Sequence, residues 1–499
     1  MKTLDNYLYH YFGYDSFKDK QKEIIKAVME KRDVFAMLAT GTGKSLCYQL
    51  PALVSDALTI VISPLIALMQ NQVQELKQKG IKRTASYNSF LTYDEKRYIL
   101  KNLSFYKILY ISPESIQLQE VLQYLCKQKI SLLAVDEAHC ISQWGHEFRT
   151  DYMKLNSIRY ALGNPPCLAL TATAAPEVQR DILQQLQLQD PVIFNDSIDR
   201  KNITMSVVSA SSEEEKKKIL LDYLKRLPIP GMVYVSSRKK AEDLSIKLKE
   251  ETALSAFSYH GGMTQEDRNL IQQQFLSGET DVICCTNAFG MGINKPDIRF
   301  IIHYDYPKDI ESYVQEIGRA GRDGEQSTAI LIRSNRDQIF PRRLIDNEFP
   351  DDHHITAVSK EIEGMLSGEI IEKTLVDMFG IEEIHARFFS HYWKEWQKQV
   401  SKNKSSDFKE YIESIFYQRK RWKYKKLNQI EEWMWDDKKC RRTRLIKYFG
   451  EYQTSAPEQC CDICGLTQPL IKEKHHKEEE VKKNITWKGR LAALLHQHS

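Results

Sequence analysis

Short, continuous apolar runs recur through the first two-thirds of this 499-residue chain, and they constrain its fold more than any other feature. Runs of this kind are typical of strands buried on both faces, as in parallel sheets covered by helices. Helical stretches lie between them, and many runs end at Gly, Pro, Asp or Thr, which favours strands over buried helix segments. The runs form two series separated near Asp196–Thr204, which predicts two α/β domains in tandem. The nine runs are Val34–Leu38, Leu58–Ile62, Ile108–Ile111, Leu132–Val135, Leu168–Leu170, Met232–Val235, Val282–Cys285, Phe300–His303 and Ala329–Ile332.

The last third of the chain has a different character. A charged, aromatic segment with helical spacing is followed by a segment that holds four of the ten cysteines and then by a highly charged stretch. This pattern predicts a helical insertion, a small metal-binding module and a mobile tail. The predicted domains are residues 1–197, 198–340, 341–437, 438–466 and 467–499.

Composition limits the class of protein. The net charge is only +4, so binding to nucleic acid must come from local patches. No apolar run approaches the roughly 20 residues of a membrane span, and Met1–His10 has no apolar core of the signal-peptide kind. We therefore expect a soluble, cytoplasmic protein without a membrane partner. In that compartment, clustered cysteines indicate a metal site rather than disulfides.

A phosphate-binding loop follows the first predicted strand. The segment Ala39-Thr40-Gly41-Thr42-Gly43-Lys44-Ser45 lies between that strand and a predicted helix. Its glycines allow backbone N–H groups to approach phosphates, Lys44 is expected to reach the β- and γ-phosphates of ATP, and Ser45 to hold magnesium. A glycine-rich turn with an exposed lysine is the alternative, and the strand-to-helix context disfavours it.

An acidic segment follows the run that ends at Val135. Asp136 and Glu137 lie at the carboxyl end of this predicted strand, which faces the nucleotide crevice of an open α/β sheet. We expect Asp136 to hold magnesium and Glu137 to orient the attacking water. His139, two residues later, is expected to couple this site to DNA.

Two arginines in the second domain are candidates for stabilising charge on the transferred phosphate. Arg319 and Arg322 lie in the segment Gln315–Gly324, and Gln315 is a further candidate catalytic residue. On a helix the two arginines share one face, and a guanidinium matches the oxygens of a transferred phosphoryl group. A surface helix with solvated arginines is the alternative for this segment alone.

Taken together, these motifs resemble the superfamily 2 helicases, and their details resemble the RecQ family. The segment Phe12–Gln21 resembles the family's adenine-recognition motif. This implies that Tyr14 stacks on the base and Gln21 hydrogen-bonds to its edge. Lys18 stands where the family usually has arginine, and lysine offers a point charge rather than a planar fork.

The resemblance also implies where DNA binds. Ser63 and Pro64 begin an element of the DNA-facing side of the first domain, and Ser112-Pro113-Glu114 matches another. Thr171-Ala172-Thr173 resembles the coupling motif that links the two domains. The second-domain segments that match family elements are Tyr234–Arg238, Tyr259–Met263 and Ala288–Asp297. The tract His139–Arg149 resembles the family's aromatic-rich loop. Aromatic side chains stack on bases and basic side chains meet phosphates. The implied DNA-binding residues are Ser63, Pro64, Trp144, Phe148, Arg149, Asn294 and Lys295.

Four cysteines near the end of the chain are predicted to bind zinc. Cys440 is followed at a distance by Cys460, Cys461 and Cys464, and four thiolates complete a tetrahedral site. The alternatives are Glu458 as an oxygen ligand or a reduced thiol cluster without metal. Such a site stabilises the fold and does no chemistry.

The predicted helical insertion contains a basic and aromatic tract, Gln418–Lys426, which either tracks DNA or forms a solvated helix face paired with nearby acids. The 35 residues after Cys464 (499 minus 464) are too few for the winged helix of many family members. The resemblance therefore does not by itself predict strong unwinding of duplex DNA.

The resemblance implies an ATP-dependent DNA helicase of 3′–5′ polarity, acting in recombination or repair with ATP, magnesium and zinc. Its implied partners are single-stranded and duplex DNA, single-stranded DNA-binding protein and other repair proteins, at the nucleoid if the source is bacterial. The alternatives are an RNA helicase, a DNA translocase without strong unwinding, and a DNA-binding scaffold with a decayed motor.

Overall fold

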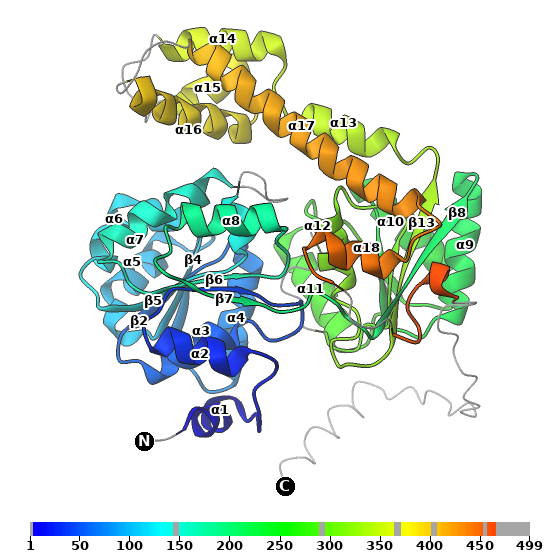
Figure 1. Ribbon diagram of the computed structural model, residues 1–499, viewed down its shortest axis with the longest axis horizontal. Coiled ribbons are helices and arrows are strands. Elements are labelled where there is room, and N and C mark those ends of the chain that lie inside the picture. Colours follow the sequence, from blue (N-terminus) through cyan, green and yellow to red (C-terminus); the bar gives the residue numbers. More distant parts are fainter. Residues whose placement is uncertain are drawn as a thin grey trace.

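The computed structural model describes residues 3–142, 149–287, 289, 295–363, 371–400, 407–452 and 457–465. They form two parallel-sheet domains, a helical insertion and a small cysteine-bearing module, as the sequence predicts (Figure 1). The predicted mobile tail, 467–499, lies outside the described residues. None of the described helices has the length and apolar character of a membrane span.

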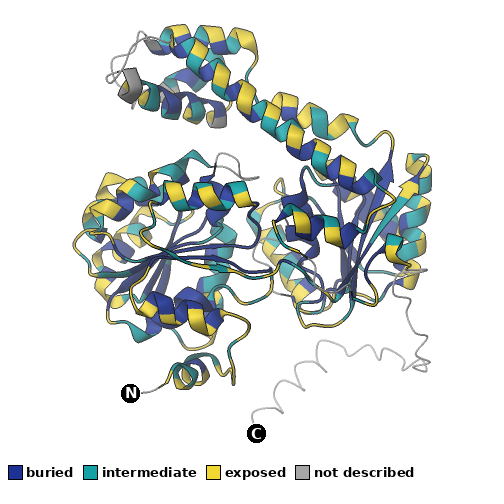
Figure 2. Cartoon of the chain, in the orientation of Figure 1, coloured by how far each residue is buried: buried dark blue, intermediate teal, exposed yellow. Residues whose placement is uncertain are grey.

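The first domain is a seven-stranded sheet in the order β3-β4-β2-β5-β6-β1-β7, and every strand pair is parallel. Helices α2, α3 and α4 pack against one face and α5 to α8 against the other, with buried apolar side chains on both sides (Figure 2). The strands are β1 (Val34–Met37), β2 (Leu58–Ile62), β3 (Thr84–Tyr87), β4 (Ile108–Ile111), β5 (Ile130–Val135), β6 (Cys167–Thr171) and β7 (Val192–Asn195). The helices are α1 (Leu4–Phe12), α2 (Gln21–Met29), α3 (Leu46–Val54), α4 (Ile66–Gln78), α5 (Tyr93–Lys101), α6 (Gln119–Leu125), α7 (Leu155–Ala161) and α8 (Pro176–Gln185).

The second domain is a six-stranded parallel sheet in the order β10-β11-β9-β12-β13-β8. Helices α9 and α10 cover one face, and α11 and α12 cover the other. The strands are β8 (Ile203–Ala210), β9 (Gly231–Tyr234), β10 (Ala256–Tyr259), β11 (Val282–Cys285), β12 (Phe300–His303) and β13 (Ser327–Ser334). The helices are α9 (Glu213–Arg226), α10 (Arg238–Glu251), α11 (Gln265–Leu276) and α12 (Ile310–Ile317).

All nine predicted apolar runs are strands, and the four strands they do not include are the edges of the two sheets. An edge strand has one neighbour and an exposed side, so it does not need a continuous apolar sequence. Strand β7 alternates between half-buried and exposed residues, and β3, β8 and β10 contain Ser or Thr.

The helical insertion forms a bundle with its own apolar core, which includes Phe389, Trp393 and Phe416. Its longest helix, α17, extends from this bundle to the second domain, while α16 contacts residues 150–154 of the first (Figure 1). The helices are α13 (Ile339–Asn347), α14 (Asp352–Glu363), α15 (Ile371–Phe379), α16 (Glu383–Val400) and α17 (Phe408–Trp435).

The cysteine-bearing module packs against the second domain through α18 (Arg441–Tyr448) and the loop before Cys464. In this loop Cys460 accepts a backbone hydrogen bond from Met205 of β8 at 3.3 Å, and Cys461 forms a parallel bridge with the same residue. The module therefore covers an edge strand that would otherwise leave backbone groups unpaired.

Candidate nucleotide site, zinc site and family

The phosphate loop lies between β1 and α3, as predicted. Gly41 and Gly43 have φ angles of 87° and 78°, a left-handed conformation that glycine adopts without steric cost. The side-chain amide of Gln21 donates hydrogen bonds to the carbonyls of Thr42 at 2.8 Å and Gly43 at 3.1 Å. The backbone of the loop is thus held in a shape that leads directly into the N-terminus of α3, where anions bind favourably.

The second domain contacts this loop through the turn after α12. The side chain of Thr40 donates a hydrogen bond to the carbonyl of Gly318 at 2.8 Å, and a Cβ atom at Gly318 would collide with Thr40. A Cβ atom at Gly41 would lie 2.8 Å from Cγ of Arg322. The phosphate loop, which holds Lys44, and the turn that holds Arg319 and Arg322 therefore face each other across one closed cleft.

The expectation that the two arginines share a helical face is wrong. Helix α12 ends at Ile317, so Arg319 and Arg322 lie in the following turn. Gly318 is the C-cap residue of the helix, and its lack of a side chain permits the close approach to the first domain. Gln315 remains on the helix and is buried.

A third arginine, which no sequence motif marks, joins the two walls of the cleft. Arg200 donates to the carbonyl of Thr40 at 2.9 Å and to the carbonyl of Gly318 at 3.0 Å. It also donates to the carbonyls of Ala320 at 3.0 Å and Gly321 at 2.6 Å. A lone arginine between two domains carries no recognisable signal in a single sequence, so only the fold identifies it.

The three guanidinium groups make this cleft strongly positive. Burial, together with the charges of Arg319 and Arg200, lowers the pKa of Arg322 to about 9, which leaves it charged at neutral pH. A bound polyanion would relieve this repulsion, and guanidinium groups match phosphate oxygens geometrically. The cleft is therefore suited to a nucleoside triphosphate.

The predicted acidic pair lies at the carboxyl end of β5. Burial and the neighbouring charge of Glu137 raise the pKa of Asp136 to about 7, while Lys44 acts in the opposite direction. Glu137 has a φ of 48°, a left-handed conformation that is uncommon for a residue with a side chain. Two adjacent carboxyl groups with such electrostatics fit a divalent cation, because a cation offsets both burial and mutual repulsion.

His139 links this acidic pair to the first domain's coupling segment. Its Nδ1 atom lies 3.4 Å from Oε2 of Glu137 and 3.0 Å from Oγ1 of Thr171, and the ring is fully buried. The backbone N–H of Thr173 donates to Oγ1 of Thr171 at 3.3 Å. A change at the Glu137 carboxylate can therefore reach the 171–173 segment through one imidazole.

The three residues expected to recognise adenine precede the phosphate loop in the sequence, and they differ in their exposure and in their contacts. Tyr14 is about half exposed, with a relative exposure of 49%, and Lys79 donates a hydrogen bond to its hydroxyl at 3.2 Å. Lys18 is exposed. Gln21 is buried, and its side-chain amide already binds the phosphate loop and accepts from the backbone of Lys18 at 2.9 Å.

Among the residues expected to bind DNA, those of the first domain lie together. Arg149 donates to the carbonyl of Pro64 at 2.9 Å and lies 3.8 Å from the carboxylate of Glu114. Ser63 is buried beside them at the end of β2. Trp144 and Phe148 lie outside the described residues.

Of the two DNA-binding candidates of the second domain, Lys295 lies within the described residues. Lys295 is buried and forms an ion pair with Asp297 at 3.1 Å, so its geometry is that of a packing residue. Asn294 lies outside the described residues.

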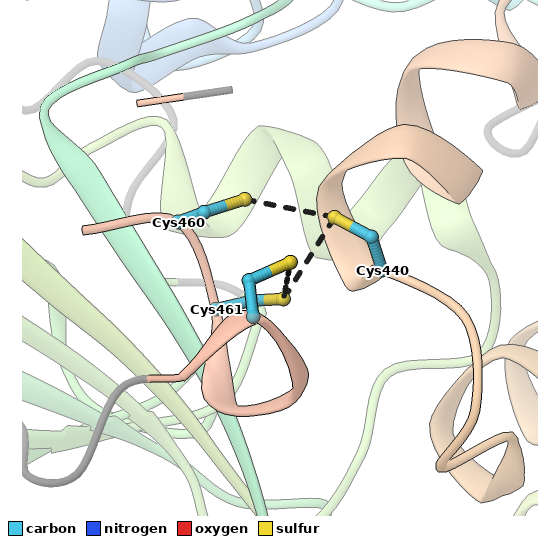
Figure 3. A group of neighbouring side chains, drawn as sticks. Cys440, Cys460 and Cys461 are labelled. Carbon is cyan, nitrogen blue, oxygen red and sulfur yellow. Dashed lines mark hydrogen bonds between the residues drawn. The ribbon is translucent and has the colours of Figure 1, made fainter. Parts of the chain in front are cut away.

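The four predicted zinc ligands converge. Figure 3 shows three of them, Cys440, Cys460 and Cys461, with their sulfur atoms pointing toward one another. The sulfur of Cys440 lies 3.6 Å from that of Cys460 and 3.8 Å from that of Cys461, and Cys461 and Cys464 are 3.5 Å apart. A tetrahedral zinc with sulfur ligands at about 2.3 Å separates its ligands by about 3.8 Å, so the spacing fits this metal. The ligand cluster does not include Glu458, which is exposed.

Cys440 lies where a thiolate is stabilised. It is the N-cap residue of α18, and although burial opposes ionisation, hydrogen bonds from Thr443 help lower the pKa of Cys440 to about 7. Metal ligation requires the thiolate form. Burial and the neighbouring thiols instead raise the pKa of Cys460 to about 12. The convergence of four sulfurs, and not the acidity of the thiols, therefore favours metal binding over a reduced thiol cluster.

The basic tract of α17 is largely engaged within the protein. Lys420 pairs with Asp346 at 2.8 Å, Lys423 pairs with Glu348, and Lys426 pairs with Glu311 at 2.6 Å. Arg419 is buried in the bundle. This tract is therefore better described as a helix face paired with acidic residues than as a DNA-binding surface. The acidic residues that pair with it are not the ones that follow it closely in the sequence. The exposed basic residues of the tract are Arg421 and Lys425.

Comparison with known proteins agrees with this architecture. Residues 18–182 match the DEAD/DEAH box helicase family, 215–324 the helicase conserved C-terminal domain, and 395–465 the RecQ zinc-binding family. The solved structure of Mycobacterium smegmatis helicase Lhr bound to ssDNA and AMP-PNP has a TM-score of 0.56 at 18% identity, covering 72% of this chain and 52% of that one. The DEAD-box helicase Mss116 bound to ssRNA and UDP-BeF has a TM-score of 0.58 at 18% identity, over 78% and 89%. These similarities concern the fold.

Closer relatives resemble the chain over nearly its whole length. The probable ATP-dependent DNA helicase RecS of Bacillus subtilis is 41% identical over 95% of this chain and 94% of its own length. The ATP-dependent DNA helicase RecQ of Pasteurella multocida is 34% identical over 93% of this chain, which spans 62% of that longer protein. The chain has two RecA-like domains that meet at a phosphate loop, and a four-cysteine module follows them in the sequence. It belongs to the RecQ family of ATP-dependent DNA helicases.

Proposed function

We propose that this protein hydrolyses ATP between its two parallel-sheet domains and uses the resulting domain movement to travel 3′–5′ along single-stranded DNA and unwind duplex DNA. The observation that carries the proposal is the meeting of the phosphate loop with Arg200 and the turn that holds Arg319 and Arg322. A cleft with a lysine loop on one wall and guanidinium groups on the other stabilises the charge of phosphoryl transfer.

Each residue of the cleft has a proposed role in hydrolysis. Lys44 binds the β- and γ-phosphates, Glu137 orients the attacking water, and Arg319 and Arg322 neutralise the charge that develops on the γ-phosphate. Asp136 and Ser45 would hold magnesium, which would offset the negative charge of the phosphates. Tyr14, whose ring is about half exposed and lies beside Phe12 and Lys79, is proposed to stack on the adenine. Gln315, buried on α12, supports the arginine turn.

DNA would lie across the carboxyl-end loops of both sheets. On the first domain, Arg149 and Pro64 form one proposed contact surface. Trp144 and Phe148 are proposed DNA contacts because their tract resembles the aromatic-rich loop of the family. On the second domain, Asn294 is the proposed contact. His139 and Thr171 would connect the hydrolysis site to this surface, because the imidazole contacts both Glu137 and the 171–173 segment.

The first test is Lys44→Ala. Because lysine supplies the charge closest to the transferred phosphate, we expect ATPase turnover stimulated by single-stranded DNA to fall at least about 100-fold, within the range of losing one preorganised charge stabiliser. Steady-state phosphate release measures this. Lys31→Ala, an exposed lysine at the opposite end of β1, is the matched control. Substantial DNA-stimulated turnover in Lys44→Ala would refute the site.

The second test is strand separation on duplexes with a 3′ or a 5′ single-stranded tail. A 3′–5′ helicase separates the 3′-tailed duplex in the presence of ATP and leaves the 5′-tailed one paired. ATP hydrolysis with translocation but without separation would indicate a translocase. Stronger stimulation of the ATPase by RNA than by DNA would indicate an RNA helicase.

We further propose that the protein acts in recombination or repair at the nucleoid, in contact with single-stranded DNA-binding protein. The support is the resemblance to RecS and RecQ relatives. Co-sedimentation of the purified chain with a single-stranded DNA-binding protein, with and without DNA, tests this partner. Absence of complex formation in both conditions would contradict it.

A further inference from the structure

The linker between the two parallel-sheet domains, residues 196–202, lies against the cysteine-bearing module. Strand β7 ends at Asn195 and β8 begins at Ile203, so these residues connect the two sheets. Arg200, which binds both the phosphate loop and the turn after α12, belongs to this linker. A contact that fixes the linker therefore also fixes how Arg200 reaches the cleft.

Arg442 of α18 binds the linker from the side of the module, and its side chain is fully buried. One terminal nitrogen donates to the carboxylate of Asp199 and, at 3.0 Å, to the carbonyl of Arg200, and the other donates to the carbonyl of Ile203. A guanidinium has several donors in one plane, so a single side chain can hold three acceptors of a bent chain. The module thus holds the backbone of Arg200, while the side chain of Arg200 binds both walls of the cleft.

Glu451, which follows α18, binds the first part of the linker. Its Oε1 accepts from the backbone N–H of Ile198 at 3.1 Å, and its Oε2 accepts from the hydroxyl of Ser197 at 2.6 Å. The preceding residue approaches the first domain, because a Cβ atom at Gly450 would lie 3.0 Å from Cγ of Pro176, the first residue of α8. The module therefore holds both ends of the linker and touches the first domain beside it.

Apolar packing supports these polar contacts. The buried residues Ile198, Ile203, Leu445 and Phe449 belong to one apolar core. Ile198 and Leu445 also line a small cavity that Thr40 of the phosphate loop bounds on another side. The linker is packed between the module and the cleft, and a displacement on one side reaches the other because close-packed interiors transmit strain.

We propose that Arg442 and Glu451 are positioning residues for ATP hydrolysis, which hold the linker so that Arg200 can bind both walls of the cleft. The inference rests on the proposed function, because it assumes that hydrolysis takes place in this cleft. The cysteine-bearing module then acts on the motor through the chain that joins its two domains. Without these contacts the linker samples other conformations, and the closed cleft forms less often.

The decisive variant is Glu451→Ala. Glu451 is half-buried, so its loss is better tolerated than the loss of Arg442, which is buried beside a carboxylate. We expect the kcat of DNA-stimulated ATP hydrolysis to fall about fivefold, within the range of mutations that alter the coupling between sites. The KM for ATP should stay within about twofold, because Glu451 is not proposed to touch the nucleotide. Steady-state phosphate release over a range of ATP concentrations separates kcat from KM.

Glu451→Gln and Tyr452→Ala are the matched controls. Glutamine keeps a carbonyl oxygen for the N–H of Ile198, and its amide can donate to the hydroxyl of Ser197. Tyr452 is the exposed neighbour, with a relative exposure of 88%. Both variants should retain kcat within about twofold of the parent, because the linker keeps its contacts. A loss in either control as large as in Glu451→Ala would overturn the proposal.

Trypsin reports on the linker without any need for ATP hydrolysis. Lys201 is exposed within the linker, and cleavage after it requires the chain to open locally. We expect the fragments 1–201 and 202–499 to form about fivefold faster in Glu451→Ala than in the parent, because lost hydrogen bonds raise the open population. Unchanged cleavage would overturn the proposal, and so would faster cleavage with an unchanged kcat.

A double-mutant cycle shows whether Glu451 acts through Arg200. In an Arg200→Lys background, Glu451→Ala should change the residual kcat by less than about twofold, since effects of coupled residues are not additive. An equally large loss in that background and in the parent would overturn the proposal. Absence of DNA-stimulated hydrolysis in the parent itself defeats the proposed function. A stimulated parent with normal kcat and normal cleavage in Glu451→Ala defeats only this inference.

Discussion

At the scale of single residues, Arg200 shows how one side chain can hold two domains at a catalytic cleft. Its guanidinium contacts a carbonyl of the phosphate loop and carbonyls of the turn after α12. Burial lowers the pKa of Arg200, with Asp323 acting in the opposite direction. A planar fork with several donors can satisfy carbonyls on both walls at once, whereas lysine cannot.

Arg200→Lys should therefore slow hydrolysis while the fold survives. We expect DNA-stimulated kcat to fall about tenfold or more, because each hydrogen bond from a charged group contributes about 1.5–3 kcal/mol. Steady-state phosphate release measures the effect, and thermal melting checks folding. Lys201→Arg, the exposed neighbour, is the control. A normal kcat in Arg200→Lys would show that closure does not need this fork.

At the scale of elements, the cysteine module and β8 support each other. The loop before Cys464 lies along the edge strand, and Thr204 donates a hydrogen bond to the carbonyl of Gln459 at 3.3 Å. Arg441 is buried, and it donates to the carbonyls of Trp433 at 2.9 Å and Met434 at 3.1 Å at the end of α17. Zinc therefore stabilises the contacts of an edge strand and a helix terminus as well as its own loop.

Zinc removal should destabilise this part of the molecule. We expect about one zinc per chain, and Cys461→Ser should lose it, because a structural site needs all four thiolates. Metal content by elemental analysis and thermal melting with and without a chelator measure the effect. Cys126→Ser, an exposed cysteine outside the cluster, should retain both zinc and stability. Equal melting of the parent with and without chelator would contradict the assignment.

At the scale of the whole molecule, α17 connects both motor domains. Lys426 is buried, and its Nζ lies 2.6 Å from Oε1 of Glu311 on α12 and 3.4 Å from Oε1 of Glu177 on α8. The hydroxyl of Tyr448 on α18 donates to Glu311 at 2.7 Å. First domain, second domain, insertion and cysteine module therefore meet at one ammonium group.

The Lys426→Met substitution should lower the free energy of unfolding by about 3–5 kcal/mol, because it leaves the Glu311 carboxylate buried without its counter-ion. Burial already raises the pKa of Glu311. A carboxyl group with a raised pKa in the folded state binds protons that the unfolded state releases, so the variant's stability should fall as pH rises above the ordinary glutamate range. Urea denaturation at several pH values measures this dependence.

A second substitution tests the same cause. Glu311→Gln combined with Lys426→Met should recover most of the lost stability, because no charge is then buried. Lys425→Met, at the exposed neighbouring position, should change the free energy of unfolding by less than about 0.5 kcal/mol. A loss in the double variant as large as in Lys426→Met would show that packing, not charge, is responsible.

The amino-acid sequence by itself determined the two parallel sheets, the phosphate loop, the acidic pair and the cysteine ligands. Each is a local signal: an apolar run of strand length, glycines before a lysine, carboxylates at a strand end, and thiols at ligand spacing. The edge strands and the role of the basic tract were not readable in this way. Edges lack the continuous apolar sequence, and the acids that pair with the tract lie far away in sequence.

Only the tertiary structure decided which residues act together. In the folded chain Arg200 contacts the phosphate loop, and Tyr234 contacts Phe289. Arg319 and Arg322 lie in the turn after α12 rather than on the helix. These contacts join residues tens to hundreds of positions apart, and their energies depend on burial and on distances that no local pattern encodes. The sequence specifies the groups, and the packing of the two domains specifies their partners.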